Sequence, residues 1–307
     1  MEATEPPAAA PACASFSDPA VLKSIAGPAK ELQADNPVFA PPAVAGRRER
    51  TEPPLAPAVP PYFVGRPAAA KAGQPIPVLL AVHGVASSGS DFAAPLVPLS
   101  QSNGWLLIAP TLQYHNYNSP LETRADDLLL ISQLDALLED VPRRTGLLIE
   151  PKVLALGFSR GAGLLERYVM ARPERIAAVA SMSSGAYTLP QACAEAAGRS
   201  EPLPFPLGTA DFERWAGRRL DAGALRRIPL WVAVGTKDVI EPPAPWDGLL
   251  GRTRVERAEA YVGLLRQFGK TAQSRLYPGL KHEVTRPELQ DALSFLQSPD
   301  TAALSHG

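Results

Sequence analysis

The chain has 307 residues, with 30 basic and 31 acidic side chains and a formal net charge of −1. This balance leaves no large basic field, so a nucleic-acid partner is not expected. Apolar residues make up 46% of the sequence. No uninterrupted apolar stretch approaches the ~20 residues that cross a bilayer. We therefore expect a globular protein with a sizeable core and no integral membrane segment.

The sequence holds only two cysteines, Cys13 and Cys193, which is too few for a disulfide scaffold. They do not show the spacing of a metal site, and neither a metal nor another cofactor is expected. The first residues lack the basic region and apolar core of a secretory signal. This favours a cytoplasmic location, or an exported one if a signal was removed. The sequence does not indicate an oligomeric state.

Proline is unusually frequent, with 34 residues, and is concentrated near the start of the chain. Proline lacks the N–H that a sheet ladder needs and favours extended conformations. Residues 1–58 are therefore expected to form an arm, either disordered or packed against the body. Residues 59–299 are expected to form the main domain, and residues 300–307 a tail.

From residue 76 onward, short apolar runs alternate with amphipathic segments long enough to be helices. Such alternation is typical of parallel βαβ units, and continuous apolar runs fit a sheet covered on both faces. The expected strands are 62–64, 78–82, 106–109, 153–158, 176–182, 230–234 and 274–277. The expected helices lie near 91–102, 120–141, 160–171, 252–268 and 286–297. The predicted fold class is α/β, with one mostly parallel sheet and helices on both faces.

A serine stands between strand 153–158 and the following helix, in the pattern Gly157-x-Ser159-x-Gly161. A sharp strand-to-helix turn lifts such a hydroxyl above the sheet, and the glycines leave room where the backbones crowd. The adjacent helix N-terminus favours negative charge. We predict that Ser159 is a nucleophile. The alternative is an ordinary glycine-rich turn with a capping serine.

A serine hydroxyl is a weak nucleophile at neutral pH, so this hypothesis requires a nearby base. His282 follows the last expected strand, at the C-terminal edge of the sheet where Ser159 also stands. We predict His282 as the base. His83 is better placed to shape the turn after the first parallel strand. The remaining histidines are His115, in a polar loop, and His306, in the tail.

A histidine base needs an acid that fixes its tautomer and stabilises its cation. Asp238 follows strand 230–234 and is the predicted acid, with Glu241 as the main competitor. Two backbone donors are expected for an oxyanion, namely the N–H groups of Arg160 and Val85. The Arg160 side chain either meets an anionic substrate or forms an ion pair within the protein.

Loops at the strand ends must form the substrate pocket. The insertion at about 186–227 carries several aromatic residues and has the character of a small lid over an apolar pocket. Alternatively, these aromatic residues anchor a long loop to the core. The candidate pocket residues are Tyr114, Tyr187, Trp215 and Trp246.

Together, the His83-Gly84-Val85 turn, the motif around Ser159, Asp238 and His282 resemble the α/β-hydrolase superfamily over residues 62–297. The order serine, aspartate, histidine is that of the superfamily. The finer pattern Gly-Phe-Ser-Arg-Gly resembles esterases of the polyhydroxybutyrate depolymerase-like and feruloyl-esterase-like branch. The chain departs from secreted members of that branch because it shows neither a signal nor a cysteine framework.

The residues and the resemblance predict a serine hydrolase that cleaves small-molecule or polymeric carboxylic esters through an acyl-enzyme. A peptidase or thioesterase with the same three residues is the enzyme alternative. A non-catalytic binding protein on the same fold is the second alternative. Dehalogenases and epoxide hydrolases of this fold use a carboxylate in place of Ser159, which argues against both.

Overall fold

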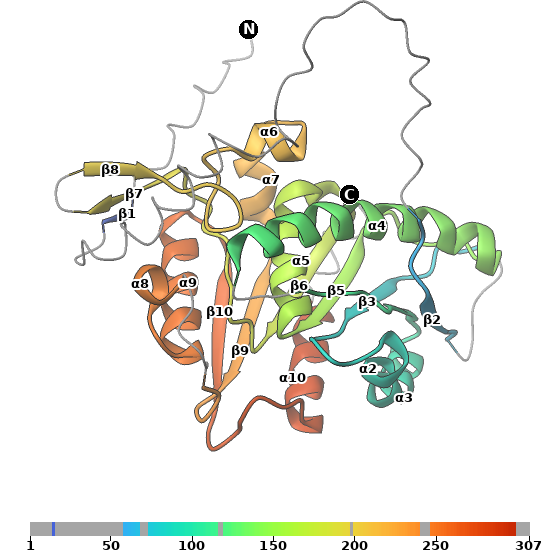
Figure 1. Cartoon of the computed structure of the whole chain (residues 1–307). Coiled ribbons are helices and arrows are strands. Elements are labelled where there is room, and N and C mark those ends of the chain that lie inside the picture. The colour runs from blue at the N-terminus through green and yellow to red at the C-terminus, as the bar shows by residue number, and fades with distance from the viewer. Residues whose placement is uncertain are drawn as a thin grey trace, which may run out of the picture.

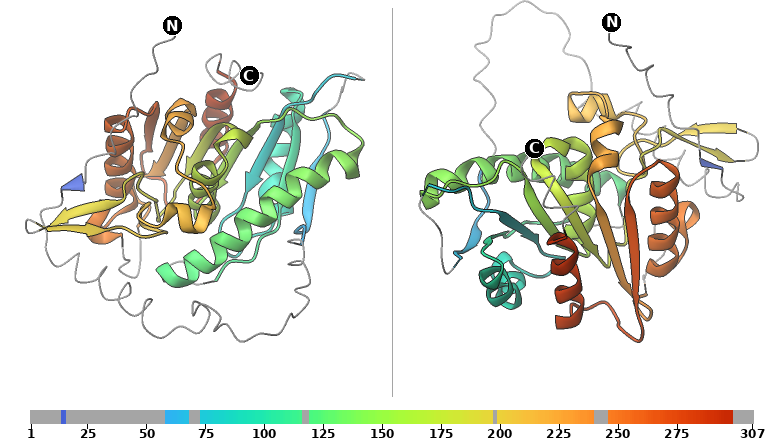
Figure 2. Two further views of the ribbon diagram at one scale, coloured as in Figure 1. Left: turned by 90° about the horizontal axis from the view of Figure 1, so that it is seen from above. Right: turned by 180° about the vertical axis from the view of Figure 1, so that it is seen from behind.

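The computed structural model describes residues 14–15, 58–67, 73–115, 119–196, 199–239 and 246–298. The expected tail and most of the expected arm lie outside the described residues, so the expectations for both stay predictions. In the part of the chain that is described, seven strands form one sheet in the order β10-β9-β6-β5-β3-β4-β2, with helices packed on it (Figures 1 and 2). The predicted α/β fold class is confirmed.

The main sheet is parallel except at one edge, where β2 runs antiparallel to β4. Its strands are β2 (Tyr62–Gly65), β3 (Val78–Val82), β4 (Leu106–Pro110), β5 (Val153–Phe158), β6 (Ile176–Met182), β9 (Leu230–Gly235) and β10 (Ala272–Tyr277). The central strands are buried almost throughout, as continuous apolar runs require. β3, β5 and β6 have the predicted bounds, and the other strands are one or two residues longer.

The helices form two layers because alternate residues of each strand point to opposite faces of the sheet. Leu80 of β3 joins one apolar cluster and Leu79 joins the other. The first cluster lies under α4 (Pro120–Thr145), α5 (Arg160–Ala171) and α9 (Arg254–Gln267). The second lies under α2 (Gly89–Ala93), α3 (Val97–Ser102) and α10 (Arg286–Leu296). None of the described helices combines the length and apolar character needed to cross a bilayer.

The insertion after β6 is packed onto the body of the protein. It contains β7 (Cys193–Ala196), β8 (Arg199–Pro202), α6 (Phe212–Ala216) and α7 (Ala222–Arg227). The Trp215 ring lies 4.3 Å from the Phe205 ring and 4.7 Å from the Phe212 ring. Arg124 of α4 forms a 2.5 Å ion pair with Asp211, the residue before α6. These contacts fit the alternative in which the aromatic residues anchor the insertion.

The far end of the insertion lies away from the C-terminal edge of the sheet. α7 contacts the 3₁₀ helix η3 (Pro173–Arg175), which leads directly into the N-terminal end of β6. Arg218, between α6 and α7, forms a 3.0 Å ion pair with Glu174 of η3. α7 therefore does not cover the edge at which β5 delivers Ser159.

Cys193 in β7 is disulfide-bonded, and the only other cysteine of the sequence is Cys13. β7 lies between β8 and the two-residue strand β1 (Ala14–Ser15) in a small separate sheet. Two cysteines exclude a scaffold of several disulfides but not this single bond. Disulfides persist mainly in oxidising compartments. The cytoplasmic location expected from the sequence stays a prediction, and this bond does not favour it.

Candidate active site

Ser159 occupies a strained turn between β5 and α5. Its φ of 54° and ψ of −119° lie in a region that side chains rarely adopt. A Cβ atom on Gly157 would come within 2.6 Å of an α-carbon of α5, and one on Gly161 within 2.3 Å of the His83 carbonyl oxygen. Only glycine fits at both positions. The crowded backbone therefore fixes the serine at the C-terminal edge of the sheet.

Three side chains that follow the C-terminal ends of β5, β9 and β10 meet at this turn. The Ser159 hydroxyl lies 2.9 Å from His282 Nε2, and His282 Nδ1 lies 2.9 Å from Asp238 Oδ2. The fully buried carboxylate accepts the Nδ1 proton, which leaves Nε2 free to accept the serine proton. The Phe158 ring stacks on the imidazole at 4.8 Å. Glu241, the competitor of Asp238, lies outside the described residues.

The second oxygen of Asp238 faces a cation. Arg254, the first residue of α9, places Nε 3.4 Å from Asp238 Oδ1 and also donates to the Ser183 carbonyl. A buried carboxylate requires such a partner, because removal of a charge from water is costly. Burial raises the pKa of the nearby Glu288 to about 7, and the charge of Asp238 acts in the same direction. The side chain of Asp238 thus lies between His282 and Arg254.

The two predicted oxyanion donors belong to segments next to Ser159. Arg160 begins α5, so its N–H has no carbonyl partner one turn earlier in the helix. Val85 lies in the turn after β3, and its side chain is 41% exposed. This turn touches the serine, since a Cβ on Gly84 would lie 3.0 Å from the Ser159 Cβ.

His83 holds the same turn in place. Its Nε2 accepts the Leu112 N–H at 3.0 Å, and its Nδ1 lies 2.6 Å from the Gly84 carbonyl oxygen, to which it donates. Burial lowers the pKa of His83, so the ring is neutral in this environment. The structure places His83 as a support of the turn, as the sequence indicated.

The Arg160 side chain is committed to buried ion pairs. Its guanidinium lies 2.5 Å from Asp127 Oδ1, and Arg167 Nη1 lies 3.0 Å from Asp127 Oδ2. The neighbouring Asp126 lies 3.9 Å from Arg160 and also contacts His115. Of the two possibilities for this side chain, the structure therefore shows the internal ion pair. This network joins α4 to the first turn of α5, directly behind the serine.

A cavity of about 690 Å³ opens beside the serine turn. Its wall is formed by the turn after β3, by α2 and α3, and by the start of α10. The residues that line it are mostly apolar and include Val85, Phe92, Pro98, Leu99, Phe158 and Leu289. Ligand pockets usually measure ~300–1,000 Å³, so this space is large enough for a substrate.

The four aromatic residues proposed for the pocket do not line this cavity. Tyr187 and Trp246 are fully buried, and the Trp246 indole donates to the Tyr187 carbonyl. Trp215 packs within the insertion. Tyr114 is half-buried, and its hydroxyl donates to the His83 carbonyl at 3.0 Å. Large aromatic side chains serve cores as readily as pockets, and these four anchor loops. The loop after residue 115 lies partly outside the described residues.

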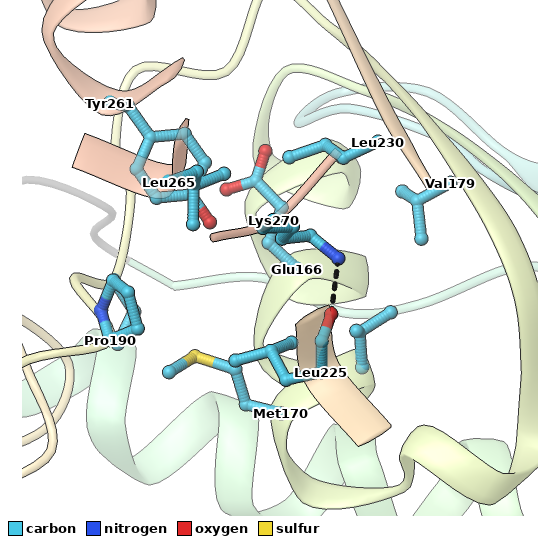
Figure 3. Close-up of a pocket in the computed structure, with 11 residues that line it drawn as sticks. Glu166, Met170, Val179, Pro190, Leu225, Leu230, Tyr261, Leu265 and Lys270 are labelled. Atoms are coloured by element: carbon cyan, nitrogen blue, oxygen red, sulfur yellow. Dashed lines mark hydrogen bonds between the residues drawn. The ribbon is translucent and has the colours of Figure 1, made fainter. Parts of the chain in front are cut away.

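A second cavity is enclosed beneath α5 and α9 (Figure 3). Its volume of about 10 Å³ holds no more than about one water molecule. Burial raises the pKa of Glu166 to about 8 and lowers the pKa of Lys270 to about 7. Lys270 Nζ donates to the Leu225 carbonyl at 2.7 Å, drawn as the dashed line. This cavity is too small for a substrate. The described residues contain no cluster of His, Cys, Asp and Glu that could hold a metal.

Comparison with known proteins agrees with the architecture. A family model for the alpha/beta hydrolase fold matches residues 77–231, half of the chain. The chain therefore belongs to the alpha/beta hydrolase fold family. A search of curated protein sequences gave no match.

Solved structures with the same fold include several hydrolases. Poly(aspartic acid) hydrolase-1 from Sphingomonas sp. KT-1 is 16% identical, with a TM-score of 0.56 over 76% of this chain and 92% of that chain. TT1662 from Thermus thermophilus is 22% identical, with a TM-score of 0.52 over 77% and 92%. The carboxylesterase of Bacillus cereus is 14% identical, with a TM-score of 0.50 over 76% and 92%. At these identities the likeness shows the fold alone.

Proposed function

We propose that the protein is a serine hydrolase that cleaves carboxylic esters through an acyl-enzyme. The observation that carries the proposal is the continuous hydrogen-bonded relay from Ser159 through His282 to Asp238, with both distances at 2.9 Å. A relay of this kind converts a weak nucleophile into a reactive one. A binding protein on the same fold has no need to keep all three groups in contact.

In the first half of the reaction, the Ser159 oxygen attacks the ester carbonyl and His282 Nε2 takes the hydroxyl proton. The buried Asp238 carboxylate stabilises the imidazolium that forms. The N–H groups of Arg160 and Val85 stabilise the oxyanion, and one such donor contributes about 10²- to 10³-fold in rate. His282 then donates its proton to the departing alcohol oxygen, which leaves the acyl group on Ser159.

In the second half, a water molecule attacks the acyl-enzyme and His282 accepts its proton. The second tetrahedral intermediate collapses, Ser159 recovers its proton from His282, and the acid is released. The same groups accept small-molecule and polymeric esters. They also accept thioesters and peptides, so the preference among these bonds is a question for experiment.

The proposal is tested by labelling the purified protein with a fluorophosphonate probe. Wild type is expected to be labelled, and Ser159→Ala is expected to be unlabelled and to lose about 10⁶-fold in kcat. Retention of a tenth of the activity in folded Ser159→Ala would overturn the proposal. Faster hydrolysis of p-nitrophenyl esters than of aminoacyl p-nitroanilides and acyl thioesters is the outcome expected of an esterase.

A further inference from the structure

The cavity of about 690 Å³ adjoins the proposed reaction centre, because residues next to Ser159 form part of its wall. Gly84 and Val85 line it, and they belong to the turn that touches the serine. Phe158, which precedes Ser159 and stacks on His282, forms another part of its wall. Figures 1 and 2 show α10 beside α2 and α3 on this face of the sheet. A group that enters the cavity can therefore extend from a carbonyl held at Ser159.

The inner surface of the cavity is apolar. The buried residues Phe92 and Leu289 line it, together with Pro98 and Leu99 from α3. The charged residues that line it, Asp91 and Arg286, are exposed to solvent. An alkyl chain or an aromatic ring gains free energy when it leaves water for such a space, whereas a charged group loses its hydration.

We propose that this cavity receives the apolar group of an ester substrate, so that esters with a medium-length alkyl or an aryl group are preferred to the smallest esters. The inference rests on the proposed function. It moves the substrate pocket away from the aromatic residues that the sequence suggested and places it between α2, α3 and α10. The acyl group and the alcohol group of an ester share this apolar chemistry, and the experiment separates them.

The test narrows the cavity at Leu99, a half-buried residue of α3 whose side chain lies in its wall. Leu99→Trp adds volume to the wall without a change at Ser159, His282 or Asp238. In the acyl arm, kcat/KM is measured for p-nitrophenyl acetate, butanoate and octanoate. In the alcohol arm, acid release is measured for ethyl, hexyl and benzyl acetates.

We expect the ratio of long-chain to short-chain kcat/KM to fall about tenfold or more in one arm, because apolar pockets discriminate by this much per methylene. A fall in the acyl arm assigns the cavity to the acyl group, and a fall in the alcohol arm assigns it to the alcohol. Leu129→Trp is the matched control, since Leu129 of α4 is 55% exposed and does not line the cavity. Its ratios should equal those of wild type.

An unchanged ratio in both arms, with wild type active, would overturn this inference and leave the proposed function intact. Wild type that hydrolyses no ester would instead overturn the proposed function. Thermal melts establish that each variant is folded. If Leu99→Trp is insoluble, Leu99→Phe makes a smaller addition at the same position and is measured in the same two arms.

Discussion

The two faces of the central sheet support the serine turn in different ways. Under α4, α5 and α9 the layer contains buried ion pairs, with Asp127 held between Arg160 and Arg167. Under α2, α3 and α10 the layer is apolar and leaves a cavity of about 690 Å³. The first face is almost filled and contains buried ion pairs, whereas the second is mostly apolar and open. The difference suggests that the first face positions the nucleophile and the second receives the substrate.

The filled face also reaches the acid of the relay. Arg254 belongs to α9 and lies 3.4 Å from the Asp238 carboxylate, which in turn holds His282. Loss of one partner from a buried ion pair is costly because the other charge stays buried without compensation. Substitutions on this face should therefore change positioning or stability, whereas substitutions on the open face should change selectivity.

After Ser159→Ala, the largest loss of activity is expected when Asp238 is substituted. Asp238→Asn keeps the shape of the side chain but favours the wrong tautomer of His282, and we expect kcat to fall by about 10⁴-fold. Steady-state kinetics with a short ester measures the change, and circular dichroism checks the fold. A loss smaller than tenfold in a folded variant would show that another carboxylate, such as Glu241, acts as the acid.

The next effect is on stability and tests the filled face. Asp127→Ala leaves Arg160 and Arg167 as buried cations without their shared partner, and we expect a loss of about 3–5 kcal/mol in the free energy of unfolding. Glu139→Ala is the control, because Glu139 lies on α4 like Asp127 but is exposed, and a surface ion pair such as the one it forms with Arg175 contributes about 1 kcal/mol or less. Urea titration measures both. If both variants lose the same free energy of unfolding, the buried network stabilises the protein no more than a surface ion pair does, and the prediction is wrong.

A smaller effect is expected at Arg254, and it falls on rate rather than on binding. Arg254→Met removes the cation from Asp238 Oδ1 and retains much of the aliphatic packing. We expect loss of this ion pair to lower kcat by about 10- to 100-fold, which corresponds to about 1.4–2.7 kcal/mol in the activation free energy. KM should stay near the wild-type value, and Arg254→Lys should recover part of the rate. A rise in KM alone would assign Arg254 to substrate binding instead.

Much of the architecture could be predicted because it depends on local patterns. The continuous apolar runs define β3, β5 and β6 at their observed bounds, and the Gly-x-Ser-x-Gly pattern marks the turn at which Ser159 stands. The positions of Asp238 and His282 after neighbouring strands follow from the parallel order of the sheet. The structure brings these three side chains within hydrogen-bond distance.

The remaining features depend on contacts between segments that are distant in the sequence. Arg254 begins a helix with a clear capping box at Thr253, but this signal does not say which carboxylate the helix end meets. Aromatic residues such as Trp246 look the same in a sequence whether they anchor a core or line a pocket. The cavity depends on how α10 packs beside α3, and no local pattern encodes that space.

The last expected effect is a pH dependence of stability within the filled face, and it is the smallest when taken per pH unit. Burial raises the pKa of Glu166 from its ordinary value of 4.5 to about 8. The folded protein therefore keeps a proton that the unfolded chain releases between these values. The free energy of unfolding should fall as pH rises through this window, by at most about 1.4 kcal/mol per pH unit from this group.

Glu166→Gln removes this contribution, so the stability of the variant relative to wild type should increase from pH 5 to pH 8. Lys270 lines the same small cavity, and its pKa, lowered by burial to about 7, has the opposite consequence. Between about pH 7 and the ordinary lysine pKa of 10.5, Lys270 is neutral in the folded protein but protonated in the unfolded chain. Lys270 therefore adds to the free energy of unfolding as pH rises through this range. Because Lys270 is present in both proteins, its contribution largely cancels in the difference. Urea titrations at pH 5, 6.5 and 8 measure the difference, and parallel pH profiles for the two proteins would show that Glu166 is ionised in the folded state.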